Sequence, residues 1–335
     1  MSQQNILPRI KLFLLGGTIT MDSSDETEGV TPTLDAEMLC RAVPGLARIA
    51  DLEARTDELL ASGNLGFSHA FSLAKDIRQA ARDDSADGFV IVQGTDTLEE
   101  MAFLLDCQLD IDLPVVVTGA MRSPSGSSAD GPANILAAVQ AAACPSVGLA
   151  GVGVVMNDDI HSSRFATKSH TGNLAAFISP NMGPLGRVVE GRVRLFCLPV
   201  QGPKLSLDEA VEIPKVALLK ASFDDEGGLL DMIETSDYQG LVIESFGAGH
   251  LPEKYLSRLG RLAPKIPVIL ASRTGAGHVF RKTYGYAGAE IDLIKRGLIP
   301  SGLLDGLKAR LFLILLLMTG ASSEEIEQSF VHWDI

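Results

Sequence analysis

Short apolar runs alternate with amphipathic stretches along the N-terminal part of this chain. The run from Arg9 to Leu15 is too short for a core helix and predicts a buried strand, because Gly16 and Gly17 follow it directly. Further strands are predicted over residues 89–92, 115–118 and 151–156, and helices over 68–82, 98–107 and 132–143. This alternation predicts an α/β fold with a larger N-terminal mixed, largely parallel sheet flanked by helices.

The apolar pattern lapses between residues 199 and 214, where prolines and glycines interrupt it. Beyond this segment, short apolar runs at 216–219, 241–243 and 268–270 predict a smaller C-terminal parallel α/β domain. The run from Leu311 to Met318 covers about half of a bilayer span, so it predicts a buried helix. The expected organisation is an N-terminal domain over 1–200, a linker over 201–214 and a second domain over 215–335.

The segment from Met21 to Thr33 is polar and acidic and shows almost no apolar periodicity. Such a composition predicts a mobile loop. Because the segment begins just after Thr18, it is placed to act as a lid over that residue.

Composition and charge exclude several classes of partner. With 335 residues, of which 46% are hydrophobic, the chain is long enough for two folded domains. Its net charge of -14 repels phosphate backbones and anionic headgroups, so neither a nucleic acid nor a membrane partner is expected. The four cysteines are widely spaced without a CxxC pair, and no secretory signal pattern is present, which predicts a cytoplasmic protein with reduced thiols.

Two predicted strands end in threonines. Thr18 follows the first glycine pair, and Thr95 and Asp96 follow the run over 89–92. A hydroxyl at the exit of a buried parallel strand lies where α/β proteins bind ligands. Each turn alone is weak evidence, and Thr97 with a glutamate three residues later has the spacing of a helix capping box.

Lys168 is a candidate proton acceptor. Most lysines are solvated, but one beside a carboxylate and a hydroxyl in a partly buried site is desolvated toward its neutral form. A threonine hydroxyl needs such a neighbour to act as a nucleophile near neutral pH. The histidines fit no metal-ligand spacing, and no phosphate-binding glycine motif follows a strand, so neither a metal nor a nucleotide cofactor is expected.

Five motifs together resemble the bacterial-type L-asparaginase family, the asparaginase/glutaminase amidohydrolases. In order along the chain they are Gly16-Gly17-Thr18-Ile19, Gly94-Thr95-Asp96-Thr97-Leu98-Glu99-Glu100, Gly119-Ala120-Met121-Arg122, Ser128-Ala129-Asp130-Gly131-Pro132 and Val155-Met156-Asn157-Asp158. Lys308-Ala309-Arg310, before the apolar run, extends the resemblance into the second domain. Five ordered motifs are far more specific than any one of them.

The resemblance implies cofactor-free hydrolysis of L-asparagine to L-aspartate and ammonia in two steps. Thr18 matches the threonine that attacks the amide carbon and forms an acyl-enzyme. Thr95, Asp96 and Lys168 match a second group, in which the lysine polarises the threonine hydroxyl and the carboxylate holds the lysine and the substrate. Together they take the base and orienting roles of other hydrolytic triads.

The resemblance also implies a substrate site shared between subunits. The backbone of Thr95 would donate to the oxyanion, the carbonyl of Ala120 would receive the leaving nitrogen, and Ser62 would bind the α-carboxylate. The family builds homotetramers as dimers of intimate dimers. Glu290 matches the acidic residue that a neighbouring subunit contributes, and His250 falls near the substrate amine; read alone, Glu290 would be a solvated loop carboxylate.

Two departures from the family affect substrate choice and activation. Gly63 stands where the family has a glutamine or glutamate on the α-ammonium. The lid lacks the family's catalytic tyrosine, and Gly29 lies near that position. Two explanations stay open for this gap. Tyr284 or Tyr286 reaches the site from a neighbouring subunit, or Thr18 is activated by water or by a lid threonine such as Thr27.

Two other functions also stay open. One is a related amidase that prefers glutamine, a D-amino acid amide or another small amide, which the missing side chain at Gly63 favours. The other is a non-catalytic amino-acid-binding module. The joint presence of Thr18, Thr95, Asp96 and Lys168 argues against that module, because binding alone needs no activated hydroxyl.

Overall fold

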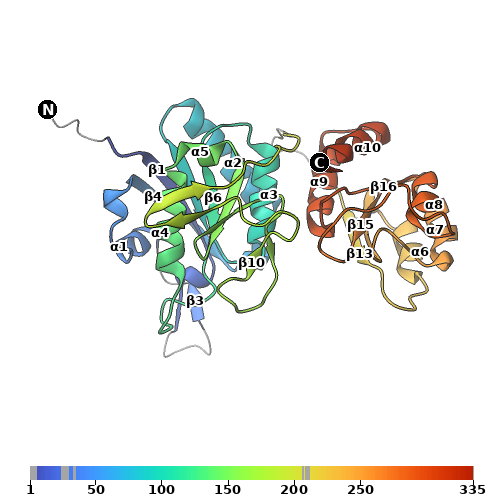
Figure 1. Ribbon diagram of the computed structural model, residues 1–335, viewed down its shortest axis with the longest axis horizontal. Helices are drawn as coiled ribbons and strands as arrows, with labels where there is room; N and C mark the ends of the chain where they lie inside the picture. The colour runs from blue at the N-terminus through green and yellow to red at the C-terminus, as the bar shows by residue number, and fades with distance from the viewer. Residues whose placement is uncertain (1–5, 24–29, 33–34, 206, 208–211, 335) are drawn as a thin grey trace. The chain divides into compact units, whose positions relative to one another are not determined.

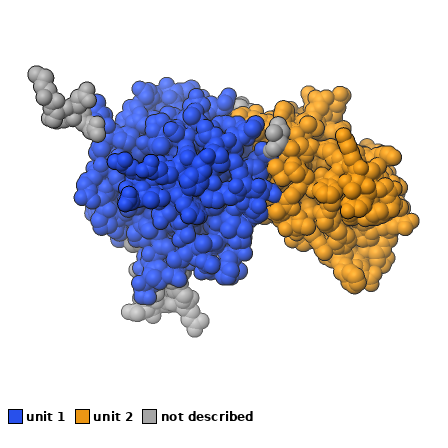
Figure 2. All heavy atoms as spheres, viewed as in Figure 1, with its two compact units in different colours: residues 1–201 blue, residues 202–335 orange. Residues whose placement is uncertain are grey.

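The computed structural model describes residues 6–23, 30–32, 35–205, 207 and 212–334. The chain divides into two compact units, residues 1–201 and residues 202–335 (Figure 2). Each unit has its own sheet and its own hydrophobic core. The described residues between 202 and 215 form neither helix nor strand.

Unit 1 is built on an eight-stranded sheet in the order β12-β11-β8-β7-β6-β5-β1-β4 (Figure 1). The strands are β1 (Arg9–Gly16), β4 (Asp51–Leu60), β5 (Gly88–Val92), β6 (Val115–Thr118), β7 (Val152–Met156), β8 (Asp159–Ser162), β11 (Gly186–Val189) and β12 (Arg192–Leu195). The strands from β4 to β7 are parallel, and β8, β11 and β12 join antiparallel. The predicted mixed, largely parallel sheet is confirmed.

Helices cover both faces of this sheet. They are α1 (Ala36–Arg41), α2 (Phe67–Arg82), α3 (Leu98–Gln108), α4 (Gly131–Ala142) and α5 (Pro145–Gly148). Successive strand side chains point to opposite faces. Ile10, Leu12 and Leu14 therefore share one core cluster with α4, while α2 and α3 lie on the other face. Burial on both faces explains why the strands appear as continuous apolar runs.

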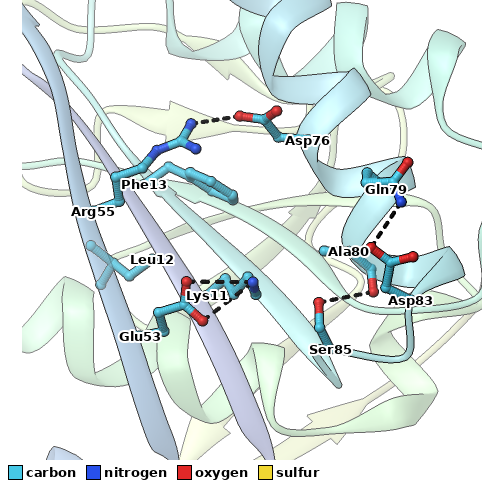
Figure 3. A pocket seen from close by; sticks show the side chains of 10 residues that line it. All are labelled: Lys11, Leu12, Phe13, Glu53, Arg55, Asp76, Gln79, Ala80, Asp83 and Ser85. Atoms are coloured by element: carbon cyan, nitrogen blue, oxygen red, sulfur yellow. Dashed lines mark hydrogen bonds and ion pairs between the residues drawn. The ribbon is translucent and has the colours of Figure 1, made fainter.

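The edge strand β4 was not predicted from the sequence pattern. Its charged residues face solvent, and several of them pair across a pocket of about 210 Å³ between β1, β4 and α2 (Figure 3). Lys11 Nζ lies 3.2 Å from a Glu53 carboxylate oxygen, and an Arg55 nitrogen lies 2.7 Å from Asp76 Oδ2. Charged side chains protect an exposed edge strand from pairing with other chains. None of the predicted site residues lines this pocket.

The prediction of a loop over the segment from Met21 to Thr33 was only partly correct. Its two ends form a hairpin, in which β2 (Met21–Ser23) pairs antiparallel with β3 (Val30–Pro32). Backbone hydrogen bonds supply this pairing, so it needs no apolar periodicity in the sequence. Thr27 and Gly29, in residues 24–29, and Thr33, in residues 33–34, lie outside the described residues.

Unit 2 contains a four-stranded parallel sheet in the order β13-β14-β15-β16. Its strands are β13 (Val216–Lys220), β14 (Gly240–Ser245), β15 (Val268–Ser272) and β16 (Leu298–Pro300). Its helices are α6 (Gly228–Glu234), α7 (Leu256–Leu262), α8 (Glu290–Lys295), α9 (Gly306–Met318) and α10 (Ser323–Val331). Residues of α6, α7 and α8 join one core cluster with the sheet, and the apolar helix α9 packs on it as well.

The motif Lys308-Ala309-Arg310 lies inside the first turns of α9 and does not precede the helix as predicted. Asp305 caps this helix by accepting from the backbone N–H of Lys308, and it also accepts from Lys308 Nζ at 2.7 Å. The fully buried Lys308 therefore forms an ion pair with Asp305 at the start of the helix. In the described part of the chain, no helix combines the length and apolar character needed to cross a bilayer.

Candidate active site

Glycines bring neighbouring strand exits into direct contact in unit 1. A side chain on Gly17, whose φ is +88°, would place its Cβ 2.1 Å from the backbone nitrogen of Gly94. A Cβ on Gly94 would lie 2.8 Å from Ser62 Oγ, and one on Gly119 would lie 2.5 Å from the carbonyl oxygen of Gln93. The exits of β4, β1, β5 and β6 therefore pack together at the carboxyl edge of the sheet, where α/β proteins bind ligands.

Thr18 and Thr95 each follow one of the touching glycines, so their backbones lie on adjacent strand exits. Thr18 begins the short 3₁₀ helix η1 (Thr18–Thr20) and is half-buried. The carbonyl of Gly17 accepts from both the backbone N–H and the hydroxyl of Thr20, which fixes this turn. Within the described part of the chain, no hydrogen bond involves the Thr18 hydroxyl.

Lys168 connects the predicted catalytic trio. It lies on β9 (Thr167–Lys168), which pairs with β10 (Phe177–Ile178). Its Nζ donates to Thr95 Oγ1 at 2.9 Å and to Asp96 Oδ1 at 2.6 Å. The lysine side chain is 16% exposed and Thr95 is buried, so the lysine lies within proton-transfer reach of a shielded hydroxyl.

Glu99 holds the backbone of Lys168 in place. It was not identified as a site residue from the sequence. Its carboxylate accepts from the backbone N–H of Lys168 at 3.1 Å, and its side chain is buried in the first turn of α3. The sequence did offer one signal for this role, because Glu99 is a charged residue in an otherwise largely apolar helix. The helix thus fixes the strand that carries the lysine.

Ser62 contacts the same turn from the exit of β4. It begins the 3₁₀ helix η3 (Ser62–Asn64), and its Oγ accepts from the backbone N–H of Asp96 at 3.2 Å. The Thr97 hydroxyl donates to the carbonyl of Ser62 at 2.8 Å, and Thr97 makes no side-chain cap bond. The predicted capping box was therefore wrong, because this hydroxyl ties two strand exits together instead. A Cβ on Gly63 would meet nothing within 4 Å, so open space surrounds this position.

Ala120 is buried in a turn that a polar network holds in place. Asn134 Nδ2 donates to the carbonyl of Gly119 at 2.9 Å, and its Oδ1 accepts from the backbone N–H of Asn157 at 3.0 Å. Asp130 accepts from the backbone N–H of Met121 at 3.0 Å. These contacts bring the motifs around Ala120, Asp130 and Asn157 together in space. They link the turns after β6 and β7.

An open pocket of about 550 Å³ adjoins the lysine. It is lined by Asp96, Glu99, Lys168, Ser169, His170 and Thr171. Its lining gives a small polar molecule access to Asp96. Across the described ranges, no group of three histidine, cysteine, aspartate or glutamate residues is arranged to hold a metal ion.

Glu290 and His250 lie in unit 2. Glu290 is fully buried at the start of α8, so its interpretation as a solvated loop carboxylate was wrong. Its Oε1 accepts from the backbone N–H groups of Thr283 at 2.8 Å and Tyr284 at 2.6 Å. Its Oε2 lies 3.5 Å from His250 Nε2 and accepts no hydrogen bond from any described residue. Burial alone would raise the pKa of Glu290, but the backbone donors outweigh burial and lower it, so the group is an anion at neutral pH.

Two tyrosine rings pack edge-on against His250. The centroid of the Tyr284 ring lies 4.9 Å from that of His250, and the Tyr286 ring lies 5.5 Å away. The two tyrosines are 42% and 55% exposed, respectively. An aromatic cluster of His250, Tyr284 and Tyr286 therefore lies beside the buried Glu290 carboxylate.

Comparison with known proteins agrees with this geometry. The family model "Asparaginase, N-terminal" matches residues 9–201, and "Glutaminase/Asparaginase C-terminal domain" matches residues 215–330. The chain belongs to the asparaginase family of amidohydrolases. The predicted family, fold class and enzyme class are confirmed.

Relatives match the chain over nearly its whole length. A probable L-asparaginase of Deinococcus radiodurans is 38% identical, and the match covers 97% of each chain. L-asparaginase 2 of Escherichia coli is 33% identical, over 97% of this chain and 93% of that protein. The crystal structure of a probable cytoplasmic L-asparaginase from Campylobacter jejuni superposes with a TM-score of 0.86 at 30% identity, covering 97% of this chain and 99% of that one.

Proposed function

We propose that this enzyme hydrolyses L-asparagine to L-aspartate and ammonia through an acyl-enzyme on Thr18. The observation that carries the proposal is the contact of Lys168 Nζ with both Thr95 Oγ1 and Asp96 Oδ1 at the sheet edge. A lysine joined to a buried hydroxyl and a carboxylate suits proton transfer, which binding alone does not need. The names of the relatives in Deinococcus radiodurans and Escherichia coli support the same reaction.

In the proposed first step, Thr18 Oγ attacks the amide carbon. The backbone N–H of Thr95 donates to the developing oxyanion, and the carbonyl of Ala120 holds the departing nitrogen. In the second step, Thr95 and Lys168 take the proton of the water that hydrolyses the ester. The glycine contacts support this division, because they set the two threonines on adjacent strand exits.

We propose that Ser62 and Asp96 hold the substrate's α-carboxylate and α-ammonium groups. The enzyme assembles as a homotetramer of intimate dimers, in which Glu290 and His250 of a neighbouring copy complete each site. The anionic Glu290 with its free Oε2 supports this role, because that oxygen has the charge to accept from an ammonium. We place the enzyme in the cytoplasm; its Campylobacter jejuni relative is named cytoplasmic, although a Haemophilus influenzae relative is named periplasmic.

A second candidate substrate is a different small amide. The open space around Gly63 favours it, because no side chain there contacts a substrate amine. One lost charge-assisted hydrogen bond weakens discrimination by about 1.5 to 3 kcal/mol.

An ammonia-release assay tests these alternatives. The panel is L-asparagine, L-glutamine, their D-forms and simple amides, with Thr18→Ala as the blank. L-asparagine should give the highest kcat/KM. A higher value for another amide would assign that substrate instead, and tight asparagine binding without ammonia would leave only the non-catalytic binding module.

A further inference from the structure

Helix α3 contacts the segment that carries Lys168 through a second carboxylate. Asp106 lies seven residues after Glu99 on this helix, so the two side chains share one helix face about two turns apart. Glu99 accepts from the backbone N–H of Lys168. Asp106 Oδ2 accepts from the hydroxyl of Ser163 at 3.0 Å, and Ser163 lies five residues before Lys168. One helix therefore holds both ends of the segment from Ser163 to Lys168.

Asp106 also binds the strand next to this segment. Its Oδ1 accepts from the backbone N–H of Val152, the first residue of β7, at 3.0 Å. The carbonyl of Val152 in turn accepts from the backbone N–H of Ser163 at 3.0 Å. A Cβ on Gly151, whose φ is +79°, would lie 2.4 Å from Asp106 Oδ1, so the glycine leaves room for the carboxylate. A single side chain thus joins the helix, the strand and the start of the segment.

The segment from Ser163 to Lys168 is compact and largely buried. The carbonyl of Ser162 accepts from the backbone N–H of Ala166 at 2.8 Å, and both Ser163 and Ala166 are fully buried. Asp106 is buried as well, in a helix whose neighbouring positions are mostly apolar. A buried carboxylate costs free energy unless hydrogen bonds compensate it, so its two donors must keep their places. A shift at Ser163 is therefore passed along the segment to Lys168.

We propose that Asp106 is a positioning residue for proton transfer by Lys168, an inference that rests on the proposed function and deepens it. Lys168 Nζ lies 2.9 Å from Thr95 Oγ1, and a misplacement of about 1 Å in such a contact costs about 10²-fold in rate. Glu99 holds the lysine at its own backbone, and Asp106 holds it through Ser163. Asp106 does not line the pocket beside the lysine, so it acts on the reaction only through Lys168.

The test measures ammonia release from L-asparagine by the full-length enzyme in two backgrounds. In the parent background, Asp106→Ala should lower kcat by about 10- to 100-fold and keep KM within about threefold, because the lysine is displaced and the substrate contacts are not. In the Lys168→Met background, the same substitution should lower the remaining kcat by less than about twofold, since the side chain that it positions is gone. A substitution that only loosened the fold would lower kcat by similar factors in both backgrounds.

Ser163→Ala repeats the test with a smaller change, because it removes only the hydroxyl that donates to Asp106. It should lower kcat by about 3- to 10-fold in the parent background and by less than about twofold beside Lys168→Met. Asp87→Ala is the matched control. Asp87 also accepts from a backbone N–H and a side chain, those of Arg9 at 2.7 and 3.1 Å, but it precedes β5, at the opposite end of that strand from the site. This control should keep kcat within about twofold of the parent.

Thermal unfolding shows whether each variant is folded at the assay temperature. Parent-like kcat in the folded Asp106→Ala and Ser163→Ala enzymes, a loss confined to KM, or an equal loss in the Lys168→Met background would overturn the positioning role. An equal loss in Asp87→Ala would overturn it too. If Asp106→Ala does not fold, Ser163→Ala alone decides between these outcomes.

The parent enzyme separates this inference from the proposed function. A parent that releases no ammonia from any amide refutes the proposed function, and the positioning role fails with it. An active parent whose Asp106→Ala and Ser163→Ala variants are equally active refutes the positioning role alone.

Discussion

Lys168 Nζ lies 2.9 Å from Thr95 Oγ1, although 73 positions separate the two residues in the sequence. The contact joins the exit of the central strand β5 to the short strand β9 outside the main sheet. Glu99 fixes the backbone of this lysine, and Asp96 contacts its ammonium group. The fold itself thereby places Lys168 within proton-transfer distance of the Thr95 hydroxyl.

The contact between Gly17 and Gly94 leads to a prediction about stability. Gly17→Ala should lower the free energy of unfolding by about 2 to 5 kcal/mol, because the new methyl group meets backbone at 2.1 Å and φ is positive. Activity should fall with it, since the two strand exits must separate. Urea unfolding and ammonia release measure both effects.

Gly260→Ala is the matched control for this substitution. Gly260 lies inside α7, and a Cβ there meets nothing within 4 Å. The control should raise stability by about 0.5 to 1 kcal/mol through helix propensity. Equal effects of the two substitutions would contradict the packing described for the strand exits.

Asn134 should matter for both stability and turnover. Asn134→Ala leaves the carbonyl of Gly119 and the N–H of Asn157 without their buried partner, which costs about 2 to 5 kcal/mol. The turn that carries Ala120 should also shift, and kcat should fall by about 10- to 100-fold. Gln328→Ala, which removes only an exposed bond, should change stability by less than about 0.5 kcal/mol. Full activity in Asn134→Ala would show that the Ala120 turn does not depend on this network.

The lowered pKa of Glu290 predicts a pH-dependent contribution to stability. A carboxyl group whose pKa is lower in the folded state stabilises the fold above its ordinary value of 4.5 and loses this contribution as pH falls through the folded value. The difference in unfolding free energy between the parent and Glu290→Gln should therefore stay constant from about pH 6 to about pH 8, where the carboxyl group is ionised in both the folded and the unfolded state. It should shrink as the solution becomes more acidic than the ordinary value. A difference that grows in acid would contradict the anionic, backbone-bonded carboxylate.

Mixed assemblies test the contribution of Glu290 to a neighbouring site. Thr18→Ala and Glu290→Ala copies, each inactive alone, should recover roughly a quarter of the parent activity when randomly co-assembled in two-fold dimers. Thr18→Ala mixed with Lys168→Met is the control, because both residues belong to the same unit and no intact site can form. Recovery in the control, or none in the first pair, would exclude a site shared in this way.

Strong local patterns allowed much of the fold to be predicted. The strands from β5 to β7 are continuous apolar runs, and the structure places them and the helices α2, α3 and α4 within one or two residues of the prediction. Strand β4 was missed because its exposed edge leaves alternating charged residues in place of an apolar run. The hairpin after Thr18 was missed because only backbone bonds define it.

The site residues were suggested by motif order, but their contacts were not. The pairing of Lys168 with Thr95 depends on where β9 lies outside the main sheet, which no local pattern shows. The roles of Glu99 and Asn134 depend on burial, which spacing alone does not reveal. The Thr97 hydroxyl was misassigned because a local capping pattern competed with a bond to Ser62, 35 positions away.

The most direct test of the account is the turnover of Lys168→Met with L-asparagine, with Lys215→Met as the control. Lys215 is an exposed lysine paired only with the surface residue Asp237 in the described structure, so its loss should leave kcat unchanged. The account predicts that Lys168→Met lowers kcat by about 10²- to 10⁴-fold while thermal unfolding stays close to that of the parent. A folded Lys168→Met enzyme that releases ammonia within about fivefold of the parent rate would contradict it.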